Sequence, residues 1–396
     1  MKSSKPQFVG KKVKLGELCE ICSGGTPKRS VAEYWKDGTI PWVKIGDMSE
    51  KYVSSTEERI TDAGFNNSSV KMLESGTLLY SIFASIGAVS ILKIPATTNQ
   101  AIAGLKIKDD SLDRDFLYHY LKSRESISKS SGRGAAQNNI NLTILRNMQV
   151  TLPSIEIQRS IVRNLEMISN QVTIAESHLM DLDALVKSRF VEIFGDFACY
   201  ETKPLIKCVD CIEAGKSPKC LAFSRKMAEP GVLKLSAISS GVYCENENKA
   251  LPRSVSLTID KVVHANDILL SRKNTPELVG RSVLVKHTDG NIMFPDIIFR
   301  MHPLPPINAM YLSYLLAGPL LHSIQSLAHG SAKSMSNIPK SELAKLSIPI
   351  PALNLQNEFA NFVSQVDKSR FGGMLHLLNS LSGIMHASFF SVADTD

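Results

Sequence analysis

The clearest pattern along the chain is a seam of apolar residues between residues 156 and 194. The apolar positions recur in alternating steps of four and three, which is typical of a helix that packs against a partner helix in a coiled coil. They are Ile161, Leu165, Ile168, Val172, Ala175, Leu179, Leu182 and Val186. Gly195-Asp196 ends the predicted helix. At 1.5 Å per residue, a helix of this extent is about 55 to 60 Å long.

A second helix is predicted at the end of the chain. Its apolar positions are Leu355, Phe359, Phe362 and Val366 and, after an interruption at Gly372-Gly373, Leu378, Leu381, Met385 and Phe389. Because enough chain for a whole domain separates the two helices, the second can return along the first. We therefore expect an antiparallel pair, with oligomerisation through each helix as the alternative.

The two helices belong to an internal repeat, which shows when the chain is compared with itself. The matched pairs are Trp42-Val43-Lys44-Ile45 with Val232-Leu233-Lys234-Leu235, residues 76–81 with 266–271, Ile86-Gly87 with Val279-Gly280, Asn139-Ile140 with Asn337-Ile338, and residues 152–158 with 350–356. The last pair is a proline followed by a helical pattern, which is a helix start signal. Each repeat thus contains several short strand patterns and then a long helix.

The predicted fold class is therefore α+β, with two repeated, mixed, strand-rich domains separated by two long helices packed as an antiparallel coiled coil. The expected domain boundaries are 1–153 for the first domain and 154–196 for the central spacer helix. Residues 197–351 form the second domain, and residues 352–396 the distal spacer helix.

Composition narrows the possible partners. The chain has 396 residues, is 43% hydrophobic and carries a formal net charge of +7, which favours a polyanionic partner such as nucleic acid. The polar N-terminus has no apolar signal segment, and no stretch approaches the roughly 20 apolar residues of a membrane span. We therefore expect a cytoplasmic protein with no membrane partner, whose seven cysteines stay reduced.

Two cysteine pairs, Cys19 with Cys22 and Cys208 with Cys211, have the internal spacing of zinc ligands. The repeat argues against a shared zinc site. When Leu15 is aligned with Leu205, Cys19 falls on Val209 and Cys22 on Ile212, so the pairs are out of phase. The cysteines are expected to be small apolar core residues, and zinc remains the alternative.

Motifs of catalysis are weak. Gly215-Lys216-Ser217 has the end of a phosphate-binding loop, but Asp210 stands where the first glycine belongs. There is no amino-methyltransferase tetrad and no zinc-protease motif. Glu247-Asn248-Lys249 resembles a fragment of a nuclease metal site, a pattern that often arises by chance. We expect no catalytic residues, no bound metal and no cofactor in this chain.

Several loops combine Gly, Lys, Arg, Asn and Gln, the residue types that approach phosphates and form paired hydrogen bonds with guanine or adenine. Each of them can equally be a solvated surface loop. The candidate DNA-binding residues are Gly24, Gly25, Thr26, Lys28, Arg29, Lys44, Arg133, Gln137, Asn138, Asn139, Lys216, Lys219, Arg272, Lys273, Asn274 and Lys333.

Together these motifs resemble the specificity subunits of type I restriction-modification systems. The resemblance covers nearly the whole chain. It is carried by Leu15-Gly16-Glu17 before the Gly-Gly-Thr-Pro turn, by Ile40-Pro41-Trp42-Val43, by residues 98–102, and by the Asn-Ile and Leu-Pro-x-x-x-x-Gln passage into a long helix. Each motif is loose, whereas their order, spacing and duplication are specific. The second half departs from the pattern at residues 215–218 and 294–297.

The resemblance implies a non-catalytic DNA-recognition subunit with two target recognition domains, which read an asymmetric, bipartite target in double-stranded DNA. It also implies two adenine methyltransferase subunits and two restriction-translocase subunits as partners, which would carry S-adenosylmethionine, ATP and Mg²⁺. The alternatives are the specificity subunit of a type IIB-like system, a coiled-coil scaffold that binds protein rather than DNA, and a metal-dependent nuclease built around Glu247 and Lys249.

Overall fold

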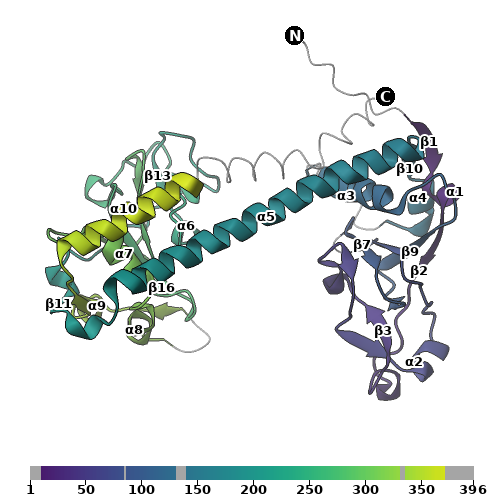
Figure 1. The fold of residues 1–396 in the computed structure, drawn as a ribbon, viewed down its shortest axis with the longest axis horizontal. Helices are drawn as coiled ribbons and strands as arrows, with labels where there is room; N and C mark the ends of the chain where they lie inside the picture. The colour runs from purple at the N-terminus through teal and green to yellow at the C-terminus, as the bar shows by residue number, and fades with distance from the viewer. Residues whose placement is uncertain (1–9, 84–85, 131–139, 331–334, 371–396) are drawn as a thin grey trace, which may run out of the picture. The chain divides into compact units, whose positions relative to one another are not determined.

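The computed structural model describes residues 10–83, 86–130, 140–330 and 335–370 (Figure 1). These residues form two compact units, 10–177 and 178–370, and each unit has its own hydrophobic core. The unit border falls inside one long helix, α5 (Ile155–Phe194).

The first unit contains three sheets. Its main sheet has five strands in the order β2-β9-β6-β7-β4, and a smaller sheet has the order β5-β3-β8. A third pair joins β1 to β10. The strands are β1 (Lys11–Lys14), β2 (Cys19–Ser23), β3 (Ile40–Val43), β4 (Tyr52–Val53), β5 (Glu58–Ile60), β6 (Leu78–Ser81), β7 (Val89–Leu92), β8 (Thr97–Thr98), β9 (Ile102–Ile107) and β10 (Gln149–Leu152). The helices are α1 (Leu15–Leu18), α2 (Asp62–Asn66), α3 (Arg114–Ser130) and α4 (Leu142–Asn147).

The second unit repeats this plan. A four-stranded sheet, β12-β19-β15-β17, corresponds to the main sheet, and β14-β13-β18 corresponds to β5-β3-β8. The strands are β11 (Thr202–Pro204), β12 (Glu213–Ala214), β13 (Gly231–Leu233), β14 (Asn248–Ala250), β15 (Ile268–Ser271), β16 (Lys273–Asn274), β17 (Ser282–Leu284), β18 (Ile292–Met293), β19 (Ile298–Met301), β20 (Ser336–Asn337) and β21 (Ser347–Pro349). The helices are α6 (Ser236–Ser239), α7 (Ala309–Ala317), α8 (Leu321–Ser326), α9 (Lys340–Ala344) and α10 (Leu353–Ser369).

The repeat predicted from the sequence is confirmed by backbone geometry. Gly76 and Asn266 both have positive φ, of 90° and 69°, and each precedes a buried strand, β6 and β15. Gly87 and Gly280 likewise have positive φ and occupy the turn between equivalent strands. The left-handed conformation explains the three glycines, because most side chains with a Cβ rarely adopt it, and asparagine is among the few residues that do. Mixed α and β content agrees with the predicted fold class.

The start of each long helix is held by a buried glutamine. The Gln158 side-chain amide donates to the Pro153 carbonyl at 2.9 Å, and its Oε1 accepts from the Asp113 backbone N–H at 2.8 Å. Gln356 makes the same pair of bonds, to Pro351 and from the Asn308 N–H, both at 2.8 Å. The glutamine of the Leu-Pro-x-x-x-x-Gln signature therefore has a structural role: its hydrogen bonds connect the start of the long helix to the loop before α3 or α7.

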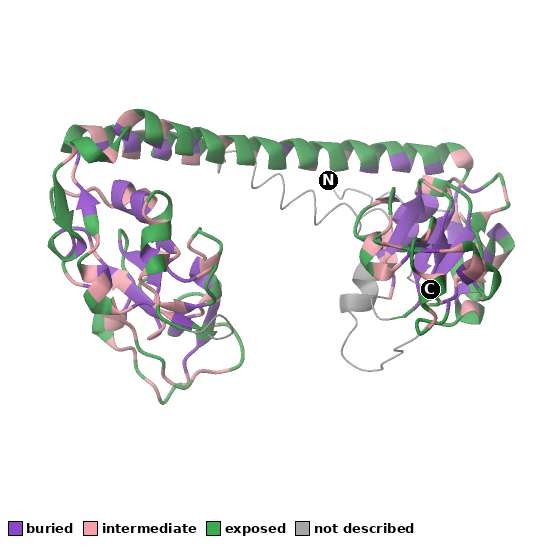
Figure 2. Cartoon of the chain, turned by 90° about the horizontal axis from the view of Figure 1, so that it is seen from below, coloured by how far each residue is buried: buried purple, intermediate pink, exposed green. Residues whose placement is uncertain are grey.

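The predicted apolar seam of α5 is confirmed in its burial. All eight seam residues are buried or half-buried, whereas Met167 and Met180, on other faces of the helix, are 59% and 73% exposed. Figure 2 shows the exposed faces along the same helix. The burial along α5 therefore follows the four-three spacing of the seam.

Within the second unit, α10 packs antiparallel against the C-terminal part of α5 (Figure 1). Arg189 on α5 pairs with Glu358 on α10 at 2.7 Å, and the Phe190 and Phe359 rings lie 5.0 Å apart. Further toward the N-terminus of α5, Asp183 pairs with Arg370. The predicted continuation of the distal helix, residues 371–396, lies outside the described residues.

The cysteines are free thiols in the described structure. Cys19 and Cys208 are buried in the two main cores, and Cys22 and Cys211 are half-buried. Among the described residues, no group of three or more His, Cys, Asp or Glu side chains could hold a metal ion. One detail of the predicted register was wrong: β2 and β12 place Cys22 opposite Gly104 and Glu213 opposite Arg300, so Cys22 corresponds to Glu213 rather than to Ile212.

Candidate nucleic-acid interface

The Gly-Gly-Thr-Pro loop of the first unit lies against the chain between β8 and β9. The Gly24 N–H donates to the Ile102 carbonyl at 3.1 Å and the Gly25 N–H to the Thr98 carbonyl at 2.9 Å. A Cβ on Gly24 would lie 2.2 Å from that Thr98 oxygen, so only glycine fits. Thr26 closes the loop with a hydrogen bond to the Gln100 side chain.

Beyond this loop, Arg29 occupies a site between two tryptophans. Its guanidinium lies 3.7 Å from the centre of the Trp35 ring and 4.7 Å from that of Trp42, which are cation–π distances. It also forms an ion pair with Glu58. The Arg29 guanidinium, together with the Lys44 ammonium, lowers the pKa of the Glu58 carboxyl.

Lys44 is held by the same acidic group. Its ammonium lies 2.7 Å from Glu57 and 2.7 Å from Glu58, and these two carboxylates raise its pKa. Two of the cations that the sequence assigns to DNA binding are therefore engaged by carboxylates of their own unit. Lys28, in contrast, is exposed and forms no ion pair with any residue that the structure describes.

The second unit contains the same loop in a different sequence. The Gly215 N–H donates to the Ile298 carbonyl at 3.3 Å and the Lys216 N–H to the Phe294 carbonyl at 3.0 Å. The Ser217 hydroxyl bonds to the Asp296 side chain, as Thr26 does to Gln100. The two departures from the family pattern, at residues 215–218 and 294–297, are thus the two sides of one equivalent contact.

When the two loops are aligned on these hydrogen bonds, Lys219 is equivalent to Lys28 and Cys220 is equivalent to Arg29. Lys216 and Lys219 are both exposed on the loop and form no ion pair within the described part of the chain. The second loop therefore presents more unpaired positive charge than the first.

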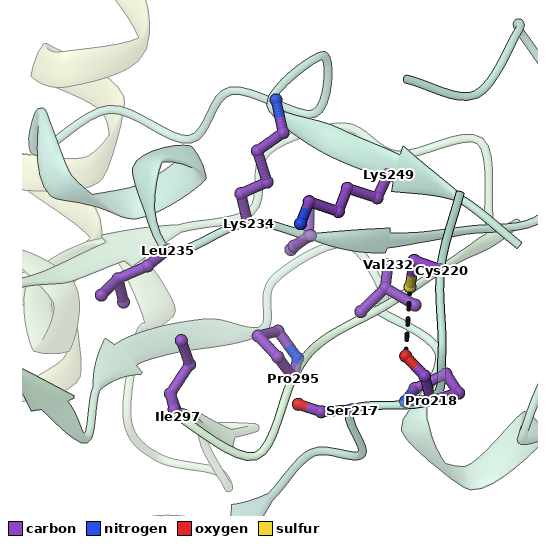
Figure 3. A pocket seen from close by; sticks show the side chains of 10 residues that line it. Ser217, Pro218, Cys220, Val232, Lys234, Leu235, Lys249, Pro295 and Ile297 are labelled. Carbon is purple, nitrogen blue, oxygen red and sulfur yellow. Dashed lines mark hydrogen bonds between the residues drawn. The ribbon is translucent and has the colours of Figure 1, made fainter. Parts of the chain in front are cut away.

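Beside the second loop lies an open cavity of about 340 Å³ (Figure 3). Its walls come from the loop, from β13 and the residues after it, from β14, and from the segment before β19. The lining residues are Ser217, Pro218, Cys220, Val232, Leu233, Lys234, Leu235, Lys249, Pro295 and Ile297. Lys234 lies 3.5 Å from Glu247, whereas Lys249 is exposed and has no ion pair with a described residue.

Three further candidates of the second unit are Arg272, Lys273 and Asn274, which follow strand β15 directly or form β16. The Arg272 side chain donates to the Asp296 carbonyl at 3.4 Å, and its guanidinium lies 5.3 Å from the centre of the Phe299 ring. Lys273 and Asn274 form strand β16, which pairs with β20. Lys273 is half-buried, and Asn274 is buried at 6% exposure, so the Asn274 side chain packs inside the unit in this structure.

Five further candidates lie outside the described residues: Arg133, Gln137, Asn138, Asn139 and Lys333. Sequence reasoning missed Lys234 as a candidate, although its repeat partner Lys44 was included. It considered Lys249 only as part of a nuclease site. Alignment of the two halves at these strands is the signal that finds both.

The geometry of the nuclease fragment is not that of a metal site. The Asn248 side chain is buried, accepting from the Arg225 N–H at 2.8 Å and donating to the Glu245 carbonyl at 2.7 Å. Glu247 accepts from the Ser236 hydroxyl at 2.6 Å. Among the described residues, Glu247 belongs to no group of three or more His, Cys, Asp or Glu side chains that could hold a metal ion.

Comparisons with known proteins match the N-terminal half of the chain in one case and most of the chain in another. Residues 10–181 match the family model described as the type I restriction modification DNA specificity domain. The chain is 28% identical over 199 residues to the MjaIX specificity subunit of Methanocaldococcus jannaschii, covering 49% of this chain and 45% of that protein. It is 23% identical over 382 residues to the MjaVIII specificity subunit of the same organism, covering 90% and 85%.

The fold is also similar to solved structures. A type I specificity subunit from M. genitalium aligns with a TM-score of 0.52 at 14% identity over 99% of this chain and 98% of that one. A chain from a study of type I complex assembly and conformational transition aligns with a TM-score of 0.59 at 16% identity, over 98% and 97%.

The architecture is a duplicated α+β plan with an equivalent loop in each unit. Residues 10–181 of the chain are similar to type I restriction-modification specificity subunits. The matched stretch spans less than half the length of three curated relatives that the chain matches. Among the described residues, no helix is long and apolar enough to span a membrane.

Proposed function

We propose that this chain is the DNA sequence-specificity subunit of a type I restriction-modification complex. It has no active site of its own and reads an asymmetric, bipartite target in double-stranded DNA. The observation that carries this proposal is the duplicated loop: one backbone arrangement, at residues 24–27 and 215–218, is surrounded by different side chains in each unit. Two copies of one scaffold with different contact residues suit two different half-sites.

The proposed domain division is 1–153 and 197–351 for the two target recognition domains. Residues 154–196 and 352–396 are the two spacer helices, packed antiparallel as a coiled coil. The contacts of α10 with α5 support the antiparallel direction. In this proposal the helix length sets the gap between the half-sites.

The proposed DNA contacts are the loop and its flanks in each unit. In the first unit these are Gly24, Gly25, Thr26, Lys28, Arg29 and Lys44, with Arg133, Gln137, Asn138 and Asn139. In the second unit they are Lys216, Lys219, Arg272, Lys273 and Asn274, with Lys333. The exposed lysines, Lys28, Lys216 and Lys219, suit phosphate contacts, because no described carboxylate neutralises them.

The proposed partners are two adenine methyltransferase subunits and, in the full complex, two restriction-translocase subunits. These subunits would hold S-adenosylmethionine, ATP and Mg²⁺, and the assembly would work in the cytoplasm, where the host DNA is. The test is purification of the tagged chain from its own host, with mass spectrometry of the proteins that accompany it. Recovery of a separate adenine methyltransferase at about two copies per chain is the expected result.

Two alternatives predict different outcomes of that experiment. A partner that fuses methyltransferase and nuclease in one polypeptide would indicate a type IIB-like system. Absence of any methyltransferase would favour a protein-binding scaffold. DNA affinity separates the scaffold further, because phosphate contacts make the affinity fall steeply as salt rises.

A further inference from the structure

The cavity of the second unit lies at the position that is equivalent to the Arg29 site of the first unit, but smaller side chains line it. The loop hydrogen bonds align Cys220 with Arg29, and the strand registers align Val232 with Trp42. In the first unit, a guanidinium and an indole fill this space, with ring contacts of 3.7 and 4.7 Å around Arg29. The much smaller cysteine and valine leave about 340 Å³ open in the second.

The charge at the site is also inverted. Trp42 lies opposite Glu58 in the β3–β5 pair, and Val232 lies opposite Lys249 in the β13–β14 pair. Lys249 therefore stands where the first unit has the carboxylate that binds Arg29 and Lys44. The lysine next to it is kept, since Lys44 corresponds to Lys234.

The first unit thus indicates what kind of group fits this place. There, the occupant is planar, lies against aromatic rings and donates hydrogen bonds to a carboxylate. In the second unit, the carboxylate is replaced by an ammonium, so the complementary occupant must accept hydrogen bonds. The walls at Pro218, Val232, Pro295 and Ile297 are apolar, which suits the edge of a base better than a hydrated ion.

We propose that this cavity is a base-reading site of the second unit, in which Lys249, supported by Lys234, recognises the O6 and N7 acceptors of a guanine. Guanine is the base that presents two adjacent acceptors in the major groove, and lysine is one of its usual partners. The cavity adjoins the exposed Lys216 and Lys219, which can hold the neighbouring phosphates. The inference rests on the proposed function, because it assigns one position within a DNA half-site.

The equivalent place in the first unit would not read guanine in this way. Its own Arg29 occupies the space, and Glu57 and Glu58 engage Lys44. The two half-sites should therefore differ at the position that these equivalent sites contact.

The test uses the full chain produced together with the methyltransferase subunits of its host. A plasmid pool with randomised sequence serves as the probe, and single-molecule sequencing records which sites become methylated. The variants are Lys249→Met, which removes the charge, Lys249→Arg, which keeps it, and Lys203→Met as a control. Lys203 is an exposed lysine on β11 that does not line the cavity.

We expect wild type to methylate a bipartite motif with a guanine in the second unit's half-site. Lys249→Met should lower the preference for that guanine by roughly tenfold and leave the first half-site unchanged. Lys249→Arg and Lys203→Met should keep the motif. If wild type yields no bipartite motif, the proposed function itself fails, which is a separate result.

Three results would overturn the inference while the proposed function stands. An unchanged motif and rate in Lys249→Met would show that Lys249 reads nothing. A uniform loss over all sequences, with a weaker dependence on salt, would make it a phosphate contact. A lowered melting temperature of the variant would assign Lys249 a structural role.

Discussion

At the scale of single residues, the structure separates exposed cations that form no ion pair with a described residue from cations that neutralise carboxylates of their own unit. Lys216 and Lys219 are exposed and have no ion pair with a described residue, whereas Arg29 and Lys44 neutralise internal carboxylates. Both groups contain loop cations of the same type in the sequence. The positions of Glu57 and Glu58 distinguish them, so net positive charge alone could not predict which cations are available.

The first prediction at this scale concerns Gly24. A Cβ there would meet the Thr98 backbone oxygen at 2.2 Å, and backbone atoms cannot move aside cheaply. Gly24→Ala should therefore lower the free energy of unfolding by about 1 to 3 kcal/mol. Gly46→Ala is the matched control, because a Cβ at Gly46 has no atom within 4 Å. Urea denaturation of both variants is the measurement, and equal midpoints would contradict the close approach.

A second residue-scale prediction concerns acid stability. The Arg225 side chain, only 5% exposed, pairs with Asp289 at 2.7 Å and lowers the pKa of that carboxyl to about 2. The folded-state pKa is thus below the ordinary value of 3.8, so the stabilisation is present above about pH 4 and is lost as the pH falls toward about 2.

Asp289→Asn should therefore be less stable than wild type at pH 7, by about 1.5 to 3 kcal/mol, the range for a hydrogen bond to a charged group. The difference should shrink between about pH 4 and pH 2, where wild type loses the charge. Thermal unfolding as a function of pH measures it. Asp181→Asn, at an exposed α5 carboxylate that forms no ion pair with a described residue, is the control and should show no such dependence.

At the scale of elements, the long helices begin in the same way in both units. Gln158 and Gln356 are fully buried, and each joins a helix start to the preceding proline and to a loop about 45 residues earlier in the chain. The sequence predicts these helix starts, because proline and the apolar period mark them. It does not predict that the glutamine is buried, since its partners come from a distant loop.

The variant Gln356→Met tests how much these buried hydrogen bonds stabilise the fold. The methionine keeps the volume but leaves the Asn308 N–H and the Pro351 carbonyl without their partner, at a cost of about 2 to 4 kcal/mol. Gln365→Met, at an exposed position of the same helix α10, should change the unfolding free energy little. Equal chemical denaturation curves for the two variants would show that the buried bonds contribute no net stability.

At the scale of the whole molecule, the proposed function makes the paired helices a ruler between two half-sites. Deleting one heptad from each, Val172–His178 and the matching stretch after Val366, removes about 10 Å of helix. The recognised gap should shorten by about three base pairs, with both half-sites unchanged. Sequencing of methylated sites measures the gap, and an unchanged gap would refute the ruler.

The sequence by itself determined the duplicated plan, the α+β class, the seam of α5 and the family resemblance. These features depend on local periodicity, turn residues and comparison of the chain with itself, and all of them are present in one dimension. The structure alone decided that Arg29 fills its site between Trp35 and Trp42, that Asn274 is buried, and that Lys249 faces an open cavity. Those outcomes depend on the register of strands far apart in the chain, which sets the partner that each side chain meets.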